Sequence, residues 1–570
     1  MLPVLKFDFA SPLRIGIMVN SFNTQAWVAR IVNDIQRSSF AQIVLVVQNA
    51  IPSVARKKPL KDRLKTYWTH SLFERYRHWD RQRNQAEMDA FGETDLTTSL
   101  SGIPVLDSTP IQKGFVDRFK PVEIARIREA NLDVLFRFGF RIIRGEILSC
   151  AKHGVWSFHH GDNREYRGAP PGFWEIYEGN PVTGSILQVL TDSLDGGGVI
   201  YRSLSATNPD SLYSSLNPMY WKTAEFAMRR LHDLHRHGWS YLESLEEFKE
   251  PDNYKKGIYR TPATPVMAQF LARQVGRRIY RRTRSLFLSE QTQWFIACRA
   301  RTSSLTALTD QTNFKSILPP RGRFYADPFL FKRNEKTFVF FENFDFSKNR
   351  AAISFAELQK DGRLGRVRTA IEKDYHLSYP FLFEYNGHVY IMPESRGHKT
   401  IELYRAIDFP QDWVFVRNIA ANVLAVDPTI FQQEGKLWLL ANIAVPGAST
   451  FDELHLFHSN TLEGDWTPHP KNPVVSDVRR SRPAGALFFE SGKLIRPSQD
   501  CSLRYGGAMT FNEVQVLSET EYREIPFARI EPHWFPRSLC THTYNRTAEF
   551  EVLDGMVIKR HLRFLNSQQT

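Results

Sequence analysis

A short motif recurs four times in the second half of the chain, at intervals of roughly 50 residues. Each copy begins with a polar or aromatic residue followed by proline, and three small or apolar residues come next. A turn and a second apolar run follow each copy. The copies are Asp327-Pro-Phe-Leu-Phe331, Tyr379-Pro-Phe-Leu-Phe383, Asp427-Pro-Thr-Ile-Phe431 and Arg482-Pro-Ala-Gly-Ala486, with a weaker fifth unit at 542–557. This period is typical of propeller blades, so we expect an all-β five-bladed propeller over residues 291–570. A large β-sandwich, also built from hairpins, is the alternative.

Length and composition indicate a folded multidomain protein. The chain has 570 residues, of which 42% are hydrophobic and 24% charged, which excludes disordered and collagen-like classes. The net charge of +13 permits an anionic substrate, a nucleic acid or an acidic membrane but selects none of them. Four cysteines stand far apart without a metal or disulfide spacing, which fits a reducing cytoplasm. No apolar run is long enough to span a membrane, so we expect a cytoplasmic protein, soluble or membrane-peripheral.

The first half alternates strands with helices. Apolar, β-branched runs at residues 14–19 and 42–47 flank a helical stretch at 24–38, the spacing of a βαβ unit. Further buried strands are predicted at 132–138 and 155–158. We therefore expect an α/β, doubly wound Rossmann-like domain over residues 1–209, with ligands at the carboxyl ends of its strands.

A helical connector is predicted over residues 210–290. Ala224, Ala227, Leu231 and Leu234 recur at steps of three and four, which indicates one helix face. Residues 273–284 are strongly basic and interleaved with apolar residues. This segment either lies on anionic lipid or phosphate, or forms a solvated interdomain helix.

Polar motifs follow the strand at 155–158 in a recognisable order: His159, then Tyr166-Arg-Gly168, then Leu194-Asp-Gly196. Over about residues 12–205 this order resembles the catalytic domain of the formyltransferases, the group that includes methionyl-tRNA, glycinamide ribonucleotide and nucleotide-sugar formyltransferases. The resemblance implies that an amine attacks a formyl carbon, that His159 stabilises the oxyanion and that Asp195 receives the amine proton. Ser157 stands where the family has asparagine, and we expect it to orient water or substrate.

The loop after His159 departs from the family pattern. The family has Ser-Leu-Leu-Pro where formyl-tetrahydrofolate binds, and this chain has polar residues instead. The resemblance implies 10-formyltetrahydrofolate as donor, although this folate loop motif is absent. The residues predicted to bind substrate or donor are His160, Asp162, Asn163, Arg164, Tyr166, Arg167 and Gly168.

A metal site in the same loop is a weaker interpretation. His159, His160, Asp162 and Asp195 have the right ligand chemistry. Adjacent histidines on a strand point to opposite faces, however, so both do not reach one ion. We expect no metal.

Charged residues occupy equivalent positions of the repeats. The predicted propeller funnel contains Asp327, Glu394, Asp427, Arg482, Arg496 and Asp500. This half resembles the amino-terminal domain of plant glucosamine inositolphosphorylceramide transferases and, more distantly, five-bladed glycosidases of the arabinanase and xylosidase kind. The second resemblance implies that Asp327, Glu394 and Asp427 form a carboxylate set for glycoside cleavage. The same residues also serve as hydrogen-bonding devices at blade corners.

The sequence favours an enzyme that transfers a formyl or related one-carbon acyl group to an amino sugar or sugar conjugate in envelope glycan synthesis. The alternatives are a glycoside-cleaving enzyme and a glycan-binding protein, each with a degenerate first domain. Methionyl-tRNA formylation and nucleic-acid binding are not favoured, because a connector and a propeller replace the expected tRNA-binding barrel. Peripheral membrane contact through residues 273–284 and the oligomeric state are left open.

Overall fold

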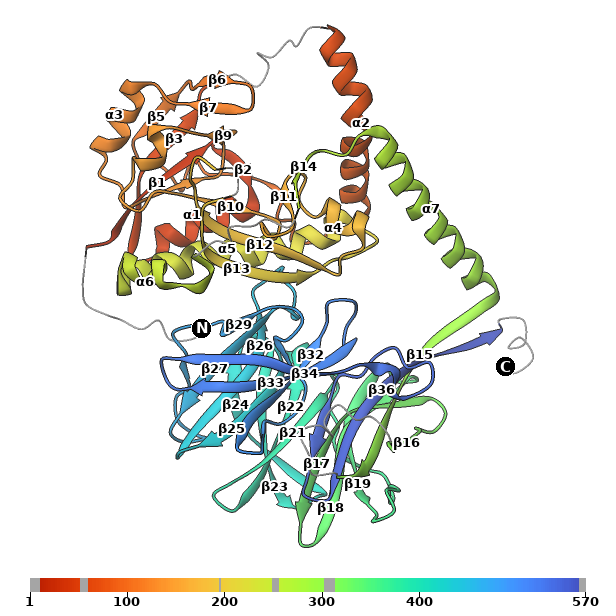
Figure 1. The fold of residues 1–570 in the computed structure, drawn as a ribbon. Helices are drawn as coiled ribbons and strands as arrows, with labels where there is room; N and C mark the ends of the chain where they lie inside the picture. The colour runs from red at the N-terminus through yellow and green to blue at the C-terminus, as the bar shows by residue number, and fades with distance from the viewer. Residues whose placement is uncertain (1–10, 52–59, 194–195, 249–255, 302–312, 563–570) are drawn as a thin grey trace. The chain divides into compact units, whose positions relative to one another are not determined.

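The computed structural model describes residues 11–51, 60–193, 196–248, 256–301 and 313–562. The chain divides into two compact units (Figure 1). One comprises Leu2–Val275, to which Val445–Ser449 are also assigned, and the other comprises Gly276–Ala444 and Thr450–Thr570. We call them the α/β unit and the β unit.

A mixed seven-stranded sheet is the centre of the α/β unit. Its strands, in spatial order, are β13 (Gly198–Ala206), β12 (Val182–Val189), β10 (Val155–His159), β8 (Val134–Arg137), β1 (Leu13–Val19), β3 (Ala41–Asn49) and β5 (Val105–Ser108). The last five strands run parallel, whereas β12 and β13 pair antiparallel at one edge. The predicted α/β sheet is confirmed, with this antiparallel edge as an addition.

Alternate residues of the central strands enter two separate cores. In β1, Ile15 and Ile17 pack on one side of the sheet and Met18 on the other. Two helices, α1 (Ala26–Arg37) and α5 (Leu212–His237), cover the first side, and α3 (Pro121–Glu129) contributes to the second. A sheet that is covered on both faces needs apolar residues at every position, which explains the uninterrupted apolar runs.

Further elements complete the α/β unit, to which only the first half of α7 (Thr264–Phe287) belongs. The remaining helices are α2 (Leu60–Asn84), α4 (Phe173–Glu178) and α6 (Trp239–Ser244), with 3-10 turns at Glu146–Ser149 and Glu246–Phe248. The minor strands are β2 (Asn23–Gln25), β4 (Glu93–Asp95), β6 (Ile111–Lys113), β7 (Val116–Arg118), β9 (Ile142–Ile143), β11 (Arg167–Gly168) and β14 (Ile258–Tyr259). We expected residues 210–290 to form a separate helical connector. Instead, α5 buries its apolar face in the first core of the α/β unit. The division between the two units falls within α7.

The described residues of the β unit form five antiparallel sheets. Four of them are consecutive along the chain: β17 (Arg323–Arg333), β18 (Lys336–Asp345), β19 (Arg350–Leu358) and β20 (Arg368–Ile371); β21 (Ser378–Tyr385), β22 (His388–Ser395), β23 (Thr400–Asp408) and β24 (Asp412–Ala421); β25 (Leu424–Gln433), β26 (Lys436–Ala444), β27 (Glu453–Ser459), β28 (Thr467–Pro468) and β29 (Val475–Ser476); β30 (Arg482–Pro483), β31 (Phe488–Glu490), β32 (Lys493–Asp500), β33 (Ala508–Leu517) and β34 (Tyr522–Ile530). Each predicted repeat therefore begins one sheet.

The fifth sheet joins the two ends of the β unit. Its order is β16 (Lys315–Ile317), β15 (Leu288–Ala300), β36 (Phe550–Leu562) and β35 (Tyr544–Arg546). Residues 542–557, the weak fifth copy, supply only part of this sheet, and β15 supplies its longest pairing, from Leu288 with Leu562 to Ala300 with Phe550.

The repeated motif has the same backbone irregularity in three sheets. Asp327, Tyr379 and Asp427 each precede a proline, adopt φ values of 50°, 44° and 52°, and coincide with a register shift in the ladder. Positive φ is costly for residues other than glycine, so surrounding contacts must hold these three bulges in place. In the part of the chain that the structure describes, no helix is both long and apolar enough to cross a membrane.

Candidate functional site

Strand β10 presents two different faces to the α/β unit. Trp156 belongs to the core under α1 and α5, and Phe158 packs against it, whereas Val155 belongs to the opposite core. Ser157 and His159 share the face of Val155 because side chains alternate along a strand. His160 follows the end of β10 and packs with the aromatic residues of the first face. The structure thus separates the two adjacent histidines, as the sequence predicts.

His159 is half-buried at the carboxyl end of β10. Its Nε2 lies 2.8 Å from the carbonyl oxygen of Tyr166. A carbonyl oxygen only accepts, so Nε2 carries a proton in this contact. A Cβ at Gly161 would lie 2.9 Å from Nε2 and 2.7 Å from the Tyr166 oxygen, so this contact needs glycine.

Ser157 is paired with a cation that sequence reasoning missed. Arg137 ends β8 and lies beside Ser157 in the parallel register. Its Nε donates to the buried Ser157 Oγ at 3.1 Å, and its Nη1 donates to the carbonyl oxygen of Arg141 at 2.8 Å. The signal for Arg137 was its position at the end of the strand that neighbours β10. The pair places positive charge on the same face as His159.

The polar residues after His159 make protein contacts. His160 stacks on Tyr220 with ring centroids 3.6 Å apart, and burial lowers the pKa of His160 to about 3. Asp162 forms an ion pair with Arg202, which also donates to Asn163 at 3.0 Å. The role of these three residues in donor binding stays a prediction.

The Tyr-Arg-Gly motif forms a second strand pair. Arg167 and Gly168 pair with β14, and Gly168 has φ 96°, with a Cβ position only 2.2 Å from the Tyr259 oxygen, which explains the glycine. The Tyr166 hydroxyl donates to Glu178 at 3.0 Å, and Lys256 lies 4.5 Å above the Tyr166 ring.

Two predicted residues remain to be considered, and the backbone N–H of one of them, Arg164, donates to Asp162 Oδ1 at 3.1 Å. Arg164 is exposed. Asp195, the predicted proton acceptor, lies outside the described residues. The structure therefore brings together Ser157, His159 and the backbone of Tyr166, and adds Arg137.

Glu175 of α4 is a buried carboxyl that sequence reasoning also missed. Its Oε1 has no hydrogen-bond partner among the described residues, and its side chain lines a small cavity with His160, Tyr166 and Arg167. Burial raises the pKa of Glu175 to about 8, so the group is mostly protonated at neutral pH.

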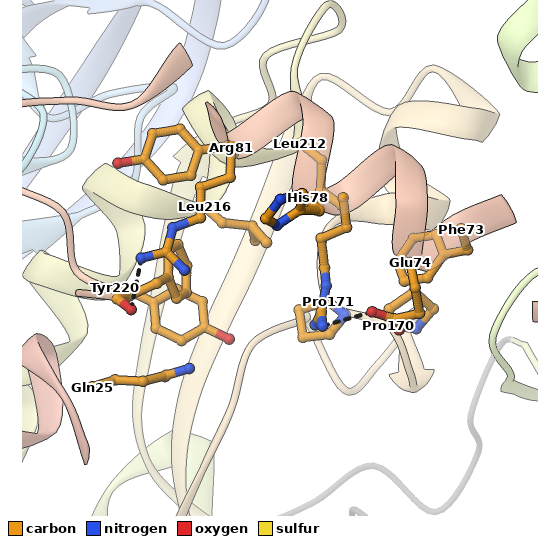
Figure 2. Close-up of a pocket in the computed structure, with 13 residues that line it drawn as sticks. Gln25, Phe73, Glu74, His78, Arg81, Pro170, Pro171, Leu212, Leu216 and Tyr220 are labelled. Carbon is orange, nitrogen blue, oxygen red and sulfur yellow. Dashed lines mark hydrogen bonds and ion pairs between the residues drawn. The ribbon is translucent and has the colours of Figure 1, made fainter. Parts of the chain in front are cut away.

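A cavity of about 380 Å³ opens between α2 and α5, with β2 contributing (Figure 2). Its wall is aromatic and apolar, and its polar lining is mainly basic. The lining includes Phe73, Phe91, Leu212, Leu216, Tyr213, Tyr220, Pro170 and Pro171, with Gln25, Glu74, Arg77, His78 and Arg81 as the polar groups. Such a cavity suits a ligand with an apolar or planar body and an anionic group.

The β unit gathers buried charges where the motifs begin. Arg482 forms an ion pair with Asp427 and lies 3.4 Å from Glu394, and Gln499 donates to Asp427 at 2.9 Å. Burial raises the pKa of Glu394 well above its usual range, and nearby Asp427 adds to the rise. Burial opposes the charge of Arg482, but Asp427 outweighs it and keeps the pKa of Arg482 high.

The carboxylates of this cluster also bind the three strained bulges. The backbone N–H of Asp327 donates to Asp554 at 3.2 Å. The N–H of Tyr379 donates to Asp327 at 3.1 Å, and that of Asp427 donates to Glu394 at 3.2 Å. The backbone N–H of each of these three residues thus donates to a buried carboxyl group.

Asp327, His542 and Asp554 offer ligand atoms that lie within 4.8 Å of one another. Two carboxylates and an imidazole have ligand chemistry that a metal ion accepts, and the absence of a metal stays a prediction. Burial disfavours the charge of His542, but Asp554 and Asp327 outweigh it and raise the pKa, so both ring nitrogens are protonated when the ring is charged. Asp554 accepts from His542 Nδ1 at 2.5 Å as well as from backbone N–H groups.

The remaining predicted funnel residues lie in other contacts. Arg496 is buried with Glu524 at 2.6 Å, and Asp500 pairs with Arg529. Asp327, Glu394, Asp427 and Arg482 come together, whereas Arg496 and Asp500 bind partners outside this cluster. Sequence reasoning missed four further members of the cluster. Glu342 and Tyr505 lie outside the repeated motif, and His542 and Asp554 lie in the weaker fifth unit without having been singled out.

Residues 306–533 match a family model described as Glucosamine inositolphosphorylceramide transferase 1, N-terminal. The chain is 34% identical over 252 residues to Glucosamine inositolphosphorylceramide transferase 1 of Arabidopsis thaliana, which covers 43% of this chain and 32% of that protein. It is also 28% identical over 135 residues to Methionyl-tRNA formyltransferase of Geobacter metallireducens, which covers 23% of this chain and 41% of that protein. These matches confirm the sequence resemblances to both groups.

Two solved structures are similar to parts of the chain. Glycinamide ribonucleotide transformylase 1 from Symbiobacterium toebii has a TM-score of 0.24 and 15% identity, and covers 42% of this chain and 89% of that chain. A family 117 glycoside hydrolase from Zobellia galactanivorans has a TM-score of 0.31 and 12% identity, and covers 48% of this chain and 91% of that chain. At these scores the likeness does not decide fold or function. The chain is thus similar to glucosamine inositolphosphorylceramide transferases over a segment of the β unit, and it spans about a third of the plant relative's length.

Proposed function

We propose that the chain is a glycan-related transferase whose α/β unit moves a formyl or related one-carbon acyl group to the amine of an amino sugar or sugar conjugate. The names of the relatives, a glucosamine inositolphosphorylceramide transferase and methionyl-tRNA formyltransferases, support a transferase. The observation that carries the proposal is the geometry of His159, which fixes Nε2 on the Tyr166 oxygen beside the Arg137–Ser157 pair. A cytoplasmic role in envelope glycan synthesis belongs to the same proposal.

In this reaction the amine nitrogen bonds to the formyl carbon, and the bond between that carbon and the donor nitrogen breaks. Protonated His159 donates from Nδ1 to the oxyanion of the tetrahedral intermediate, while Nε2 keeps its hydrogen bond to Tyr166. Arg137 adds positive charge through Ser157. The amine proton passes to Asp195, whose role stays as the sequence predicts, and the leaving donor nitrogen takes up a proton.

The donor that we propose is 10-formyltetrahydrofolate. The chain's residues do not match a folate loop, because His160 stacks on Tyr220, and Arg202 holds Asp162 and Asn163. No residue is therefore assigned to hold the folate, and the step above requires only a donor that carries the acyl group on a nitrogen. Other one-carbon acyl donors that transfer to an amine fit the same proposal.

We place the acceptor in the cavity between α2 and α5. Pro170 and Pro171 line it directly after the Tyr-Arg-Gly motif, and Tyr220 lines it while stacking on His160. Arg77 and Arg81 match a phosphate on the acceptor, such as that of a sugar nucleotide or sugar phosphate. Arg77→Ala should therefore raise KM for a phosphorylated amino sugar more than it lowers kcat.

The test is transfer from 10-formyltetrahydrofolate to amino sugars and their nucleotides by the full chain, read by mass spectrometry as the gain of one CO. His159→Ala should lower kcat by about a hundredfold or more. His388→Ala, which replaces an exposed histidine of the β unit, is the control and should keep full activity. Full activity of folded His159→Ala protein would contradict the assignment.

We also propose that the five sheets are blades of one closed β-propeller. Contacts between successive sheets support this arrangement: Tyr379 with Asp327, Tyr379 with Thr429, Arg482 with Asp427, Tyr544 with Ala484, and Thr543 with Asp327. These contacts join each sheet to the next and the fifth sheet to the first, as a closed propeller would require.

Glycoside cleavage or glycan binding by the β unit is the second candidate function. The observation that favours it is the pair of buried carboxyls Glu394 and Asp427: burial raises the pKa of Glu394, Arg482 pairs with Asp427, and cleavage needs one protonated and one ionised carboxyl. Release of reducing sugar that Glu394→Gln abolishes would support cleavage. Sugar binding without turnover would support a binding role.

A further inference from the structure

The second half of α7 is an exposed amphipathic helix. The first half is anchored, because Met267, Phe270 and Gln274 are buried and Gln274 donates to the Pro209 oxygen at 2.8 Å. After Gln274, α7 has no buried residue through to its end at Phe287. Burial in the protein therefore does not explain the apolar residues of these last turns (Figure 1).

Large apolar side chains form one face of these turns. Val275, Ile279 and Leu286 recur at steps of four and seven, so they align along the helix, and Tyr280 and Phe287 flank them. All five side chains are exposed, from 50% at Val275 to 63% at Tyr280. A run of five exposed large apolar residues on one helix marks an interaction surface.

Arginines form most of the other face. Arg277, Arg281 and Arg284 recur at steps of four and three, and Arg278 lies at the edge of their face. Arg282 lies within the apolar row, three residues after Ile279 and four before Leu286, where its long side chain can extend toward the headgroups. Thr264–Phe287 contains no acidic residue. Arg284 pairs with Glu290 beyond the helix. The arginine side chain stays positively charged throughout the pH range in which proteins remain folded.

We propose that residues 275–287 of α7 dock on the surface of an anionic membrane. A helix with large apolar side chains on one face and arginines on the other lies in the plane of a lipid interface, with the apolar face at the acyl boundary and the cations at the headgroups. Charge complementarity selects anionic lipid over a second copy of this chain, since two copies would bring ten arginines together. This docking is independent of the reaction proposed above.

Vesicle flotation with the full chain tests the proposal. Wild-type protein should float with phosphatidylcholine vesicles that contain phosphatidylserine and stay behind with phosphatidylcholine alone, and raised salt should weaken the binding. The double variant Arg277→Gln, Arg281→Gln should lower the partition coefficient by about thirtyfold. Arg366→Gln, an exposed arginine of the β unit, is the matched control and should bind as wild type.

The apolar face is tested by Ile279→Asp. This change should lower vesicle binding by tenfold or more, whereas Ile407→Asp, at a residue 72% exposed in β23, should not. All replaced side chains are solvent-exposed, so an unchanged unfolding midpoint checks that each variant folds. Absence of wild-type binding to anionic vesicles at low salt would overturn the proposal. A dimer that Ile279→Asp converts to monomer, without vesicle binding, would overturn it in favour of self-association.

Discussion

Two buried histidines show how differently the two units treat charge. His160 of the α/β unit and His542 of the β unit are both almost fully buried. Burial among the rings of Trp27 and Tyr220 lowers the pKa of His160 to about 3. In His542 burial acts in the same direction, but Asp554 and Asp327 outweigh it and raise the pKa. The neighbours of a buried group, rather than burial itself, decide whether it carries charge.

The same difference extends to the backbone. Aromatic packing fills the region behind β10, whereas carboxylates of the β unit hold three N–H groups at strained bulges. The charges of the β unit therefore support its fold in addition to any chemistry. The four predictions below test this contrast: the first three run from the largest expected effect to the smallest, and the fourth compares the pH dependence of the two units directly.

Asp554→Ala should destabilise the β unit most. It removes the acceptor for the N–H groups of Asp327, His542 and Thr543 and leaves the imidazolium of His542 without its closest counter-ion. Breaking a buried ion pair in this way costs about 3–5 kcal/mol of unfolding free energy. Calorimetry of the full chain measures the loss, with exposed Asp374→Asn as control. A loss below 1 kcal/mol would show that the carboxylate does not hold the bulges.

Glu175→Gln should stabilise the α/β unit at neutral pH. The folded state keeps the proton up to a pKa of about 8, while the unfolded chain releases it near 4.5. Stability is therefore full below pH 4.5 and falls as pH rises toward 8, by about 3 kcal/mol at pH 7. Glutamine removes this fall. Urea unfolding at pH 4.5 and pH 7 should show equal stabilities of variant and wild type at the lower pH and a more stable variant at the higher, and the reverse order would contradict the assigned pKa.

Tyr379→Phe removes one hydroxyl from the centre of the β unit. That hydroxyl lies 2.9 Å from Thr429 Oγ1 and accepts from the N–H of Gly485 at 2.8 Å. Leaving these buried groups unpaired should cost about 1–3 kcal/mol. Tyr385→Phe, on a less buried tyrosine of the same strand, should cost less. Equal losses would mean that the hydroxyl does not link the sheets.

The two histidines should give the units opposite pH dependence. Between about pH 3 and 6.5, His160 is protonated in the unfolded chain and neutral in the folded chain. The free energy of unfolding of the α/β unit therefore falls by about 1.4 kcal/mol for each pH unit as pH falls. His542 has a raised folded pKa, so its contribution is full below pH 6.5 and is lost as pH rises through that pKa. His160→Phe should flatten the acid limb of the α/β unit alone, as measured by hydrogen exchange. A change in the β unit's profile would refute the separation.

Much of the fold followed from local sequence patterns. The strands 14–19, 42–47 and 155–158 appear as β1, β3 and β10, because uninterrupted β-branched runs need a sheet covered on both faces. Each repeat marks the start of a sheet. The antiparallel edge of β12 and β13 and the joining of β15 with β36 were not predictable, since nothing local encodes which distant strand a given strand pairs with.

The sequence predicted the candidate sites less completely than it predicted the fold. Alternation along β10 predicted that His159 and His160 separate, and the motifs led to Asp327, Glu394, Asp427 and Arg482. Arg137 was not predicted because its partner Ser157 lies on a neighbouring strand. Glu175 was not predicted because its helix carries no motif. Contacts between elements far apart in sequence need the register of the strands, which patterns do not supply.

The pairing of β36 with β15 also bears on how the protein is made. The thirteen residues of β15 pair with residues of β36 that are synthesised about 250 residues later. At typical synthesis rates this interval lasts roughly ten seconds or more, during which β15 presents an unpaired edge. The β unit therefore completes its folding only after β36 leaves the ribosome, and a cell that makes this protein must protect one strand until its partner arrives.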